Sequence, residues 1–172
     1  HLVSPYSKME FAYKQPKHQD WFDVKVGNVR LNDVDIPGYF STKELRVGGL
    51  WINDVLLQNL KNRKIPVEPH IVPMIYEGLQ KAPVRFKIDT ASVANFSVVY
   101  EELPVKGDKP GKLYFTDMNG QFSGLTNIVS YPEQFIRLHA DGNLMGSGHF
   151  TATWQLPVDS LYDRFLLDAR LD

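Results

Sequence analysis

Residues 136–156, IRLHADGNLMGSGHFTATWQL, decide the fold because their apolar and polar side chains alternate in two runs. Apolar residues take every second position of 136–140 and again of 150–156. A period of two is typical of strands that place one face on an apolar layer and the other in water. The connector between the runs is rich in glycine and asparagine, which tolerate positive φ, so the runs are predicted to pair as an antiparallel hairpin.

The same alternation extends outward from this hairpin. Residues 165–171 are predicted to form a strand, and its position at the last residues suggests a segment of a longer protein. A second hairpin is predicted at Asn119-Gly120, the preferred type I′ turn pair, which would join residues 112–118 to 121–125. Residues 104–111 are polar and are predicted to be an exposed connection.

The N-terminal half contains a repeat in which Val-Gly and Asn-Asp-Val recur in place. Residues 25–36 align with 46–57, and a fainter third copy covers 87–98. Chance similarity among valine-rich strands is the alternative. If the repeat is real, each copy is one long strand with a small or polar irregularity in its middle, and the copies lie side by side.

The overall expectation is one mainly β domain over residues 1–172. We predict a mostly antiparallel sheet of roughly eight to ten strands, strongly twisted or curled into a groove. A single short α-helix is predicted to begin near Pro73 and to end at Ala82-Pro83.

Composition and motifs exclude several function classes. The 19 basic and 20 acidic residues leave a net charge of -1, which does not favour nucleic acid as a partner. The chain has no cysteine and none of the common nucleotide-binding or hydrolase motifs, so we predict no enzyme and no cofactor. His139 and His149 could form a two-histidine metal site across the hairpin, but no third ligand is evident, and solvent-facing histidines are favoured. No metal site is therefore predicted.

A longer pattern in the chain resembles the AsmA-like proteins of Gram-negative envelopes, over roughly residues 22–172. The pattern places asparagine and Tyr-Glu inside strands, ahead of a glycine-rich hairpin. It consists of DTASVANFSVVYEE at 89–102, KLYFTDMNG at 112–120, LTN at 125–127, LMGSG at 144–148 and the closing strand at 165–171. The basic loop at 63–66 and the helix at Pro73 are similar to an arrangement in Bacteroidetes-type members.

The resemblance implies a non-enzymatic segment of a periplasmic protein built of repeating β units and anchored in the inner membrane. Such proteins are related to TamB and to bridge-like lipid-transfer proteins, whose sheets form a trough lined by apolar side chains. The implied partners are phospholipid acyl chains, and a membrane through parts of the parent outside this chain. The implied role is phospholipid transport or outer-membrane assembly. This chain departs from the family in lacking the N-terminal membrane helix and the great length.

An apolar trough could assist lipid movement without any catalytic residue. Exposing an acyl chain to water costs about 0.8 kcal/mol per CH₂, so a 16-carbon chain costs on the order of 12 kcal/mol. An uninterrupted apolar face would remove most of that cost. The predicted lining residues are Ile136, Leu138, Phe150, Trp154, Phe165 and Leu167.

The alternative is a secreted carbohydrate- or protein-binding β-sandwich in which these same side chains form a closed core. Its binding platform would be made of Trp21, Trp51 and Tyr100. The two readings predict different architectures. A sandwich has two facing sheets and a dry core, whereas a conduit segment has one sheet with an open apolar concavity.

Overall fold

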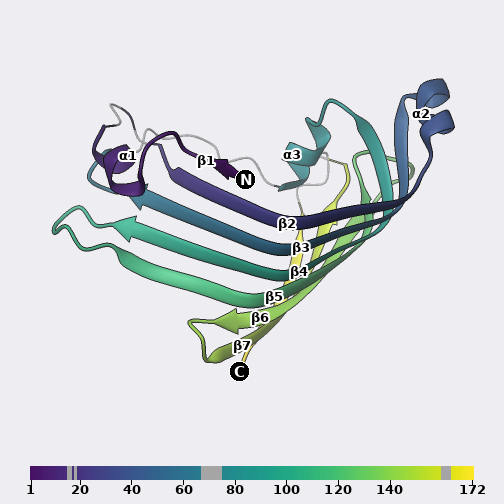
Figure 1. Cartoon of the computed structure of the whole chain (residues 1–172). Helices are drawn as coiled ribbons and strands as arrows, with labels where there is room; N and C mark the ends of the chain where they lie inside the picture. Colours follow the sequence, from purple (N-terminus) through teal and green to yellow (C-terminus); the bar gives the residue numbers. More distant parts are fainter. Residues whose placement is uncertain (15–16, 18, 67–74, 160–163) are drawn as a thin grey trace.

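The computed structural model describes residues 1–14, 17, 19–66, 75–159 and 164–172. The described strands form one eight-stranded sheet in which each strand pairs with its neighbours in the sequence. Figure 1 shows the long strands β2 to β5 as bowed ribbons lying side by side. The strands are β1 (Leu2–Val3), β2 (Trp21–Val34), β3 (Glu44–Asn62), β4 (Arg85–Leu103), β5 (Gly111–Thr126), β6 (Phe135–Leu144), β7 (Gly148–Pro157) and β8 (Leu166–Leu171). The mainly β prediction is confirmed.

The mostly antiparallel pairing is confirmed, and the predicted strong curl is wrong. The sheet is mostly antiparallel, but β3 and β4 pair in parallel. Parallel neighbours need a crossover connection, and the long segment between Asn62 and Arg85 supplies it. The sheet is not strongly curled, and it is not closed, because β1 and β8 remain separate edges at the two ends of the strand order.

The described residues contain three short helices, where the sequence predicted one. They are α1 (Lys8–Lys14), α2 (Ile36–Thr42) and α3 (Ile75–Gln80). The predicted helix corresponds to α3, although Pro73 lies outside the described residues. Helices this short carry too few turns for an apolar period of about 3.6 residues to be visible. Their end signals are nevertheless present, since Glu10 accepts hydrogen bonds from Ser7, and Asp35 accepts one from the Gly38 amide.

Of the two predicted hairpins, one is confirmed and one is wrong. β6 and β7 pair as an antiparallel hairpin, as the alternation predicted. Asn119-Gly120 makes no turn, because β5 runs through it. Gly120 pairs with Val93 on one side and Ala140 on the other, and the Asn119 side chain accepts a hydrogen bond from the Asn95 amide. A strand paired on both sides overrides the local turn preference. The connection predicted at 104–111 corresponds to residues 104–110, which lie between β4 and β5.

The sequence repeat corresponds to three adjacent strands. The first two copies pair antiparallel in β2 and β3, so the Val-Gly of each lies opposite the Asp-Val of the other. Asp33 and Asp54 have positive φ of 52° and 58°. A Cβ added to Gly27 would lie 2.8 Å from the Asp54 Cβ, and one added to Gly48 would lie 2.9 Å from the Asp33 Cβ. In each of the two copies, therefore, a glycine makes room for an aspartate of the other copy whose backbone has the left-handed conformation.

The third copy extends this line of irregular residues across the sheet. β4 pairs in parallel with β3, and Asn53 lies beside Ala94 in the register. Asn95 then has a positive φ of 52°, and its Nδ2 donates to Asp54 Oδ1 at 2.6 Å. Asp117 in β5 has a φ of 53°, and the register shifts beside it. Each of these residues advances the side-chain alternation by one position.

The glycine pairing gives a stability prediction. Gly27→Ala should lower the free energy of unfolding by about 1–3 kcal/mol, because the added Cβ would collide with the Asp54 Cβ rather than with a flexible side-chain end. Gly111→Ala is the matched control, since its Cβ would meet nothing nearer than the Glu102 carbonyl oxygen at 4.0 Å. Urea unfolding of both variants measures the difference. Equal stability of the two variants would contradict the pairing.

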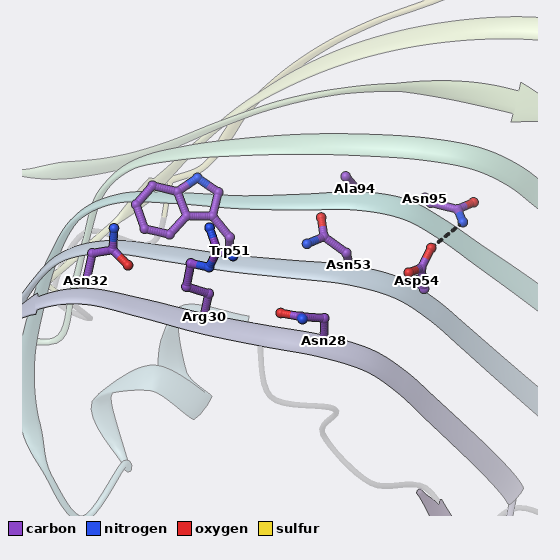
Figure 2. A pocket seen from close by; sticks show the side chains of 8 residues that line it. All are labelled: Asn28, Arg30, Asn32, Trp51, Asn53, Asp54, Ala94 and Asn95. Carbon is purple, nitrogen blue, oxygen red and sulfur yellow. Dashed lines mark hydrogen bonds between the residues drawn. The ribbon is translucent and has the colours of Figure 1, made fainter.

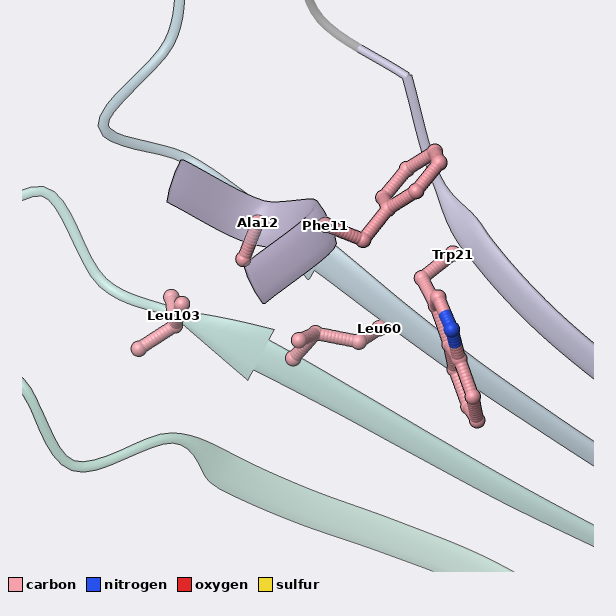
Figure 3. Close-up of a cluster of buried hydrophobic side chains, with 5 residues drawn as sticks. All are labelled: Phe11, Ala12, Trp21, Leu60 and Leu103. Atoms are coloured by element: carbon pink, nitrogen blue, oxygen red, sulfur yellow. The ribbon is translucent and has the colours of Figure 1, made fainter. Parts of the chain in front are cut away.

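The tightly buried side chains form two small clusters at separate places on the sheet. Phe11 and Ala12 of α1 pack against Trp21, Leu60 and Leu103, as Figure 3 shows. The second cluster contains Ile136, Leu156 and Val158, with Leu79 of α3 packed against it. Each cluster covers only a small area of the sheet. The helices therefore leave a broad part of both faces without a second layer of described residues.

Candidate functional site

An apolar groove of about 670 Å³ lies on one face of the sheet. Its lining comes from every strand from β2 to β8, and Asn119 is the one polar side chain among the described lining residues. The lining residues are Val26, Ile52, Val55, Val93, Phe96, Val98, Phe115, Met118, Asn119, Gly120, Phe122, Leu138, Ala140, Phe150, Ala152, Trp154, Leu167 and Ala169.

Side-chain size makes this face hollow. Strand register places a row of small residues across the sheet, made of Gly120, Ala140, Ala152 and Ala169. The next row on the same face contains larger side chains, namely Phe122, Leu138, Trp154 and Leu167. On the other side of the small row stand Phe96, Met118 and Phe150. The small residues therefore form a floor, and the groove runs across the strands between two walls of large apolar side chains.

The left-handed residues keep this face apolar. In β3, Ile52 and Val55 both line the groove although they are separated by Asn53 and Asp54. Strict alternation would place Val55 on the opposite face from Ile52. The positive φ of Asp54 shifts the alternation by one position, so Val55 returns to the groove face. Asn95 has the same effect between Val93 and Phe96. The polar irregularity in each repeat copy is thus what aligns apolar side chains from both halves of a long strand.

The two clusters of buried side chains lie differently with respect to the groove. In β3, Leu60 is an odd number of positions from Val55 in a stretch of unbroken register, so alternation places it, with α1, on the opposite face. Leu156 alternates with Trp154 and shares the groove face, and Leu79 of α3 packs beside it. Hence α3 closes one side of the groove, and α1 leaves it uncovered.

Four of the six predicted lining residues lie in the groove, and two do not. Leu138, Phe150, Trp154 and Leu167 are lining residues. Ile136 is 1% exposed and belongs to the cluster beside α3, because its partner Leu156 and the neighbouring Val158 close over that end of the hairpin. Phe165 precedes β8 and is 46% exposed, so it has no strand pairing to aim it inward.

Sequence reasoning missed the half of the groove supplied by β2 to β5. Val26, Ile52, Val93 and Phe96 were not among the predicted lining residues, although they stand in the repeat copies. At each residue with positive φ, the alternation of side chains between the two faces shifts by one position. A search for a simple period of two therefore does not find these groove residues. Their signal is the recurrence of apolar residues on each side of Asn-Asp and Ala-Asn at matching positions of the three copies.

The aromatic residues of the alternative platform do not lie together. Trp21 is 6% exposed, packs beneath α1, and its Nε1 donates to the Tyr6 carbonyl at 3.2 Å. The Tyr100 hydroxyl donates to Glu102 Oε2 at 2.7 Å. Trp51 stays partly exposed, at 36%. The described residues form a single sheet, so the two facing sheets of a sandwich are not found in this part of the chain.

The environment of Tyr100 predicts a pH effect. Burial, together with the hydrogen bond to Glu102, raises the pKa of the Tyr100 hydroxyl from 10.0 to about 12. The folded state therefore keeps this proton where the unfolded chain loses it. Stability from Tyr100 is complete below pH 10.0 and should be lost as the pH rises to about 12. Across that pH interval, the free energy of unfolding should fall less steeply with pH for Tyr100→Phe than for the original chain. An equal dependence on pH in the two proteins would contradict this.

The two histidines considered as metal ligands are not neighbours. His139 pairs with Thr153 and its ring lies 3.2 Å from the Thr153 hydroxyl, whereas His149 pairs with Asn143. Within the described residues, no group of three or more histidine, cysteine or acidic side chains is arranged to hold a metal ion. In the same part of the chain, no helix has the length and apolar character needed to cross a membrane.

No protein family matches the chain, and a search of curated proteins found no match.

Proposed function

We propose that this chain is a non-enzymatic segment of an AsmA-like envelope protein, in which the groove shields lipid acyl chains from water. The open apolar groove is the single observation that carries the proposal. Among the described residues, its lining side chains are apolar except for Asn119, so this surface suits hydrocarbon and offers no titratable group for acid-base chemistry. The proposed role is a contribution to phospholipid transport or outer-membrane assembly in the periplasm.

The energetics favour a lipid tail as the ligand. Burying an acyl chain recovers about 0.8 kcal/mol per CH₂, so a groove that covers even half of a 16-carbon chain gains on the order of 6 kcal/mol. A contiguous apolar surface that is open to water is typical of a binding site, whereas single apolar residues scattered over a surface are not. A tail lying along the floor of small residues would contact the walls on both sides.

The resemblance adds the family and the location to the proposal. The strand-embedded asparagine of that pattern, Asn95, is one of the residues whose positive φ aligns the apolar face. Residues of the pattern in β4, β5 and β8 are among those that line the groove. In this proposal, the path of a lipid over long distances and the attachment to a membrane belong to other parts of the parent protein.

Native mass spectrometry tests the proposal. The chain is incubated with vesicles of phosphatidylethanolamine and phosphatidylglycerol, separated from them, and sprayed under non-denaturing conditions. We expect a population heavier by the mass of one phospholipid, which disappears when the sample is unfolded. A mass equal to that of the chain alone, at every lipid concentration tried, would sink the proposal.

A further inference from the structure

We propose that the face opposite the groove binds an oligosaccharide, with one sugar ring stacked on Trp51. A hollow of about 540 Å³ lies there. Four asparagines line it, together with Arg30, Trp51, Asp54 and Ala94 (Figure 2). Strand alternation separates this hollow from the groove, because Trp51 and Asn53 flank the groove residue Ile52 in β3. The inference is therefore independent of the lipid proposal.

Trp51 is held as a platform by the residue next to it on the same face. A Cβ added to Gly49 would lie 2.1 Å from Trp51 Cη2 and 2.5 Å from Cζ3, so the indole ring covers the Gly49 backbone. Only glycine leaves room for this placement. Figure 2 shows the ring face-on above the strands, and the side chain remains 36% exposed. One face of the ring is thus supported by the sheet while the other is presented to solvent.

An exposed aromatic face is suited to the carbon-bound hydrogens of a sugar ring. The face carries the negative part of the ring quadrupole, and the hydrogens of a pyranose ring are weakly positive and apolar. Trp51 supplies this contact at the edge of a hollow that is otherwise polar. An apolar patch flanked by polar groups matches the two-sided character of a sugar.

The remaining lining residues supply both hydrogen-bond donors and hydrogen-bond acceptors. Asn28, Asn32 and Asn53 make no side-chain hydrogen bond within the described part of the chain, so their amides are available to a ligand. A carboxamide offers both donors and acceptors, as a sugar hydroxyl does. Asp54 and Asn95 are fixed by their mutual hydrogen bond of 2.6 Å. Arg30 and Asp54 bring opposite charges to the hollow, so its described lining carries no net charge, which favours a neutral polyhydroxylated ligand over an anion.

The site continues beyond a single sugar ring. Trp51 also lines a neighbouring hollow of about 650 Å³ on the same sheet face. That hollow contains further hydroxyl, amide and imidazole groups, including Ser92, Gln121, His139 and Thr153. Register places Trp51, Ser92, Gln121, His139 and Thr153 in one row across β3 to β7. A chain of several sugar units could follow this row with Trp51 near one end.

An array of bacterial and plant oligosaccharides, probed with the labelled chain, tests the inference. We expect retention of at least one oligosaccharide class, and tryptophan fluorescence titration with that oligosaccharide then gives its affinity. Trp51→Ala should weaken binding at least tenfold, whereas Trp51→Phe should retain part of it because a flat ring remains. Asn53→Ala replaces an amide without structural hydrogen bonds, so it should fold normally and weaken binding severalfold.

The control is a groove variant, Val26→Glu with Leu167→Glu, which changes the other face of the sheet. It should bind the oligosaccharide as the original chain does, even where it no longer captures lipid. Failure of the array to retain the original chain would overturn the inference. So would binding that neither Trp51→Ala nor Asn53→Ala reduces. Loss of glycan binding in the groove variant would also count against a separate site.

Discussion

Placing two carboxylates in the groove should abolish phospholipid capture. Val26 on β2 and Leu167 on β8 line the groove and are 42% and 50% exposed, so the double change to glutamate should leave the fold intact. An acyl chain would then cover charged groups without partners, which costs several kcal/mol. Each loss of about 1.4 kcal/mol is a tenfold weaker affinity, so we expect capture to fall by about 100-fold or more. Native mass spectrometry after vesicle incubation measures it.

The control for this prediction adds the same charge to the opposite face. Thr151 and Gln155 alternate with groove residues of β7 and pair with Arg170 and Arg137. Thr151→Glu with Gln155→Glu should therefore capture phospholipid as the original chain does. If both double variants lost lipid equally, the effect would come from net charge or vesicle repulsion, and the groove would not be the binding surface.

The largest stability loss among the residues discussed should come from Ile136→Ala. Ile136 is 1% exposed and packs with Leu156 and Val158 beneath Leu79. Removing its branched side chain leaves a cavity that this small cluster cannot easily fill, so the free energy of unfolding should fall by about 2–5 kcal/mol. Urea unfolding followed by tryptophan fluorescence measures the change.

Phe165→Ala is the comparison for Ile136→Ala. Sequence reasoning placed both residues in the groove lining, but Phe165 is 46% exposed and lies outside it. Its truncation should change stability by no more than about 0.5 kcal/mol. Neither single change should reduce lipid capture by the molecules that remain folded. Similar stability losses for the two variants would contradict the positions that the structure gives them.

The alternating runs made the C-terminal half of the sheet predictable from sequence. In 136–140 and 150–156, apolar and polar side chains alternate without interruption, so strand faces and hairpin pairing could be assigned together. Leu138, Phe150 and Trp154 were found in this way, and Leu167 was found from the strand predicted at 165–171. The error at Ile136 arose because alternation identifies a face but does not show which part of that face another element covers.

The central strands could not be assigned by the same reasoning. Asp54, Asn95 and Asp117 each adopt positive φ inside a strand, and each changes the phase of the alternation. Asn119-Gly120 has the residues of a type I′ turn, but it pairs with strands on both sides, and a local sequence pattern does not show that pairing. The parallel pairing of β3 and β4 depends on where the crossover returns, and that is set by packing over the whole sheet.

The repeat connects these observations. Its glycines and left-handed aspartates pair across β2 and β3, and its third copy extends the line to β4. Polar side chains from this line, such as Asp54 and Asn95, lie among the residues of the Trp51 hollow, whereas the apolar residues beside them line the groove. One structural device therefore gives the two faces their different chemistry.

Photo-cross-linking with a phospholipid that carries a diazirine in its acyl chain tests the groove most directly. After irradiation and digestion, the account predicts adducts on groove residues from several strands, with Phe96, Met118 and Leu138 among them. It also predicts that an excess of unlabelled phospholipid prevents these adducts. Adducts concentrated around Trp51 and His139 on the opposite face, or spread over both faces without competition, would contradict it.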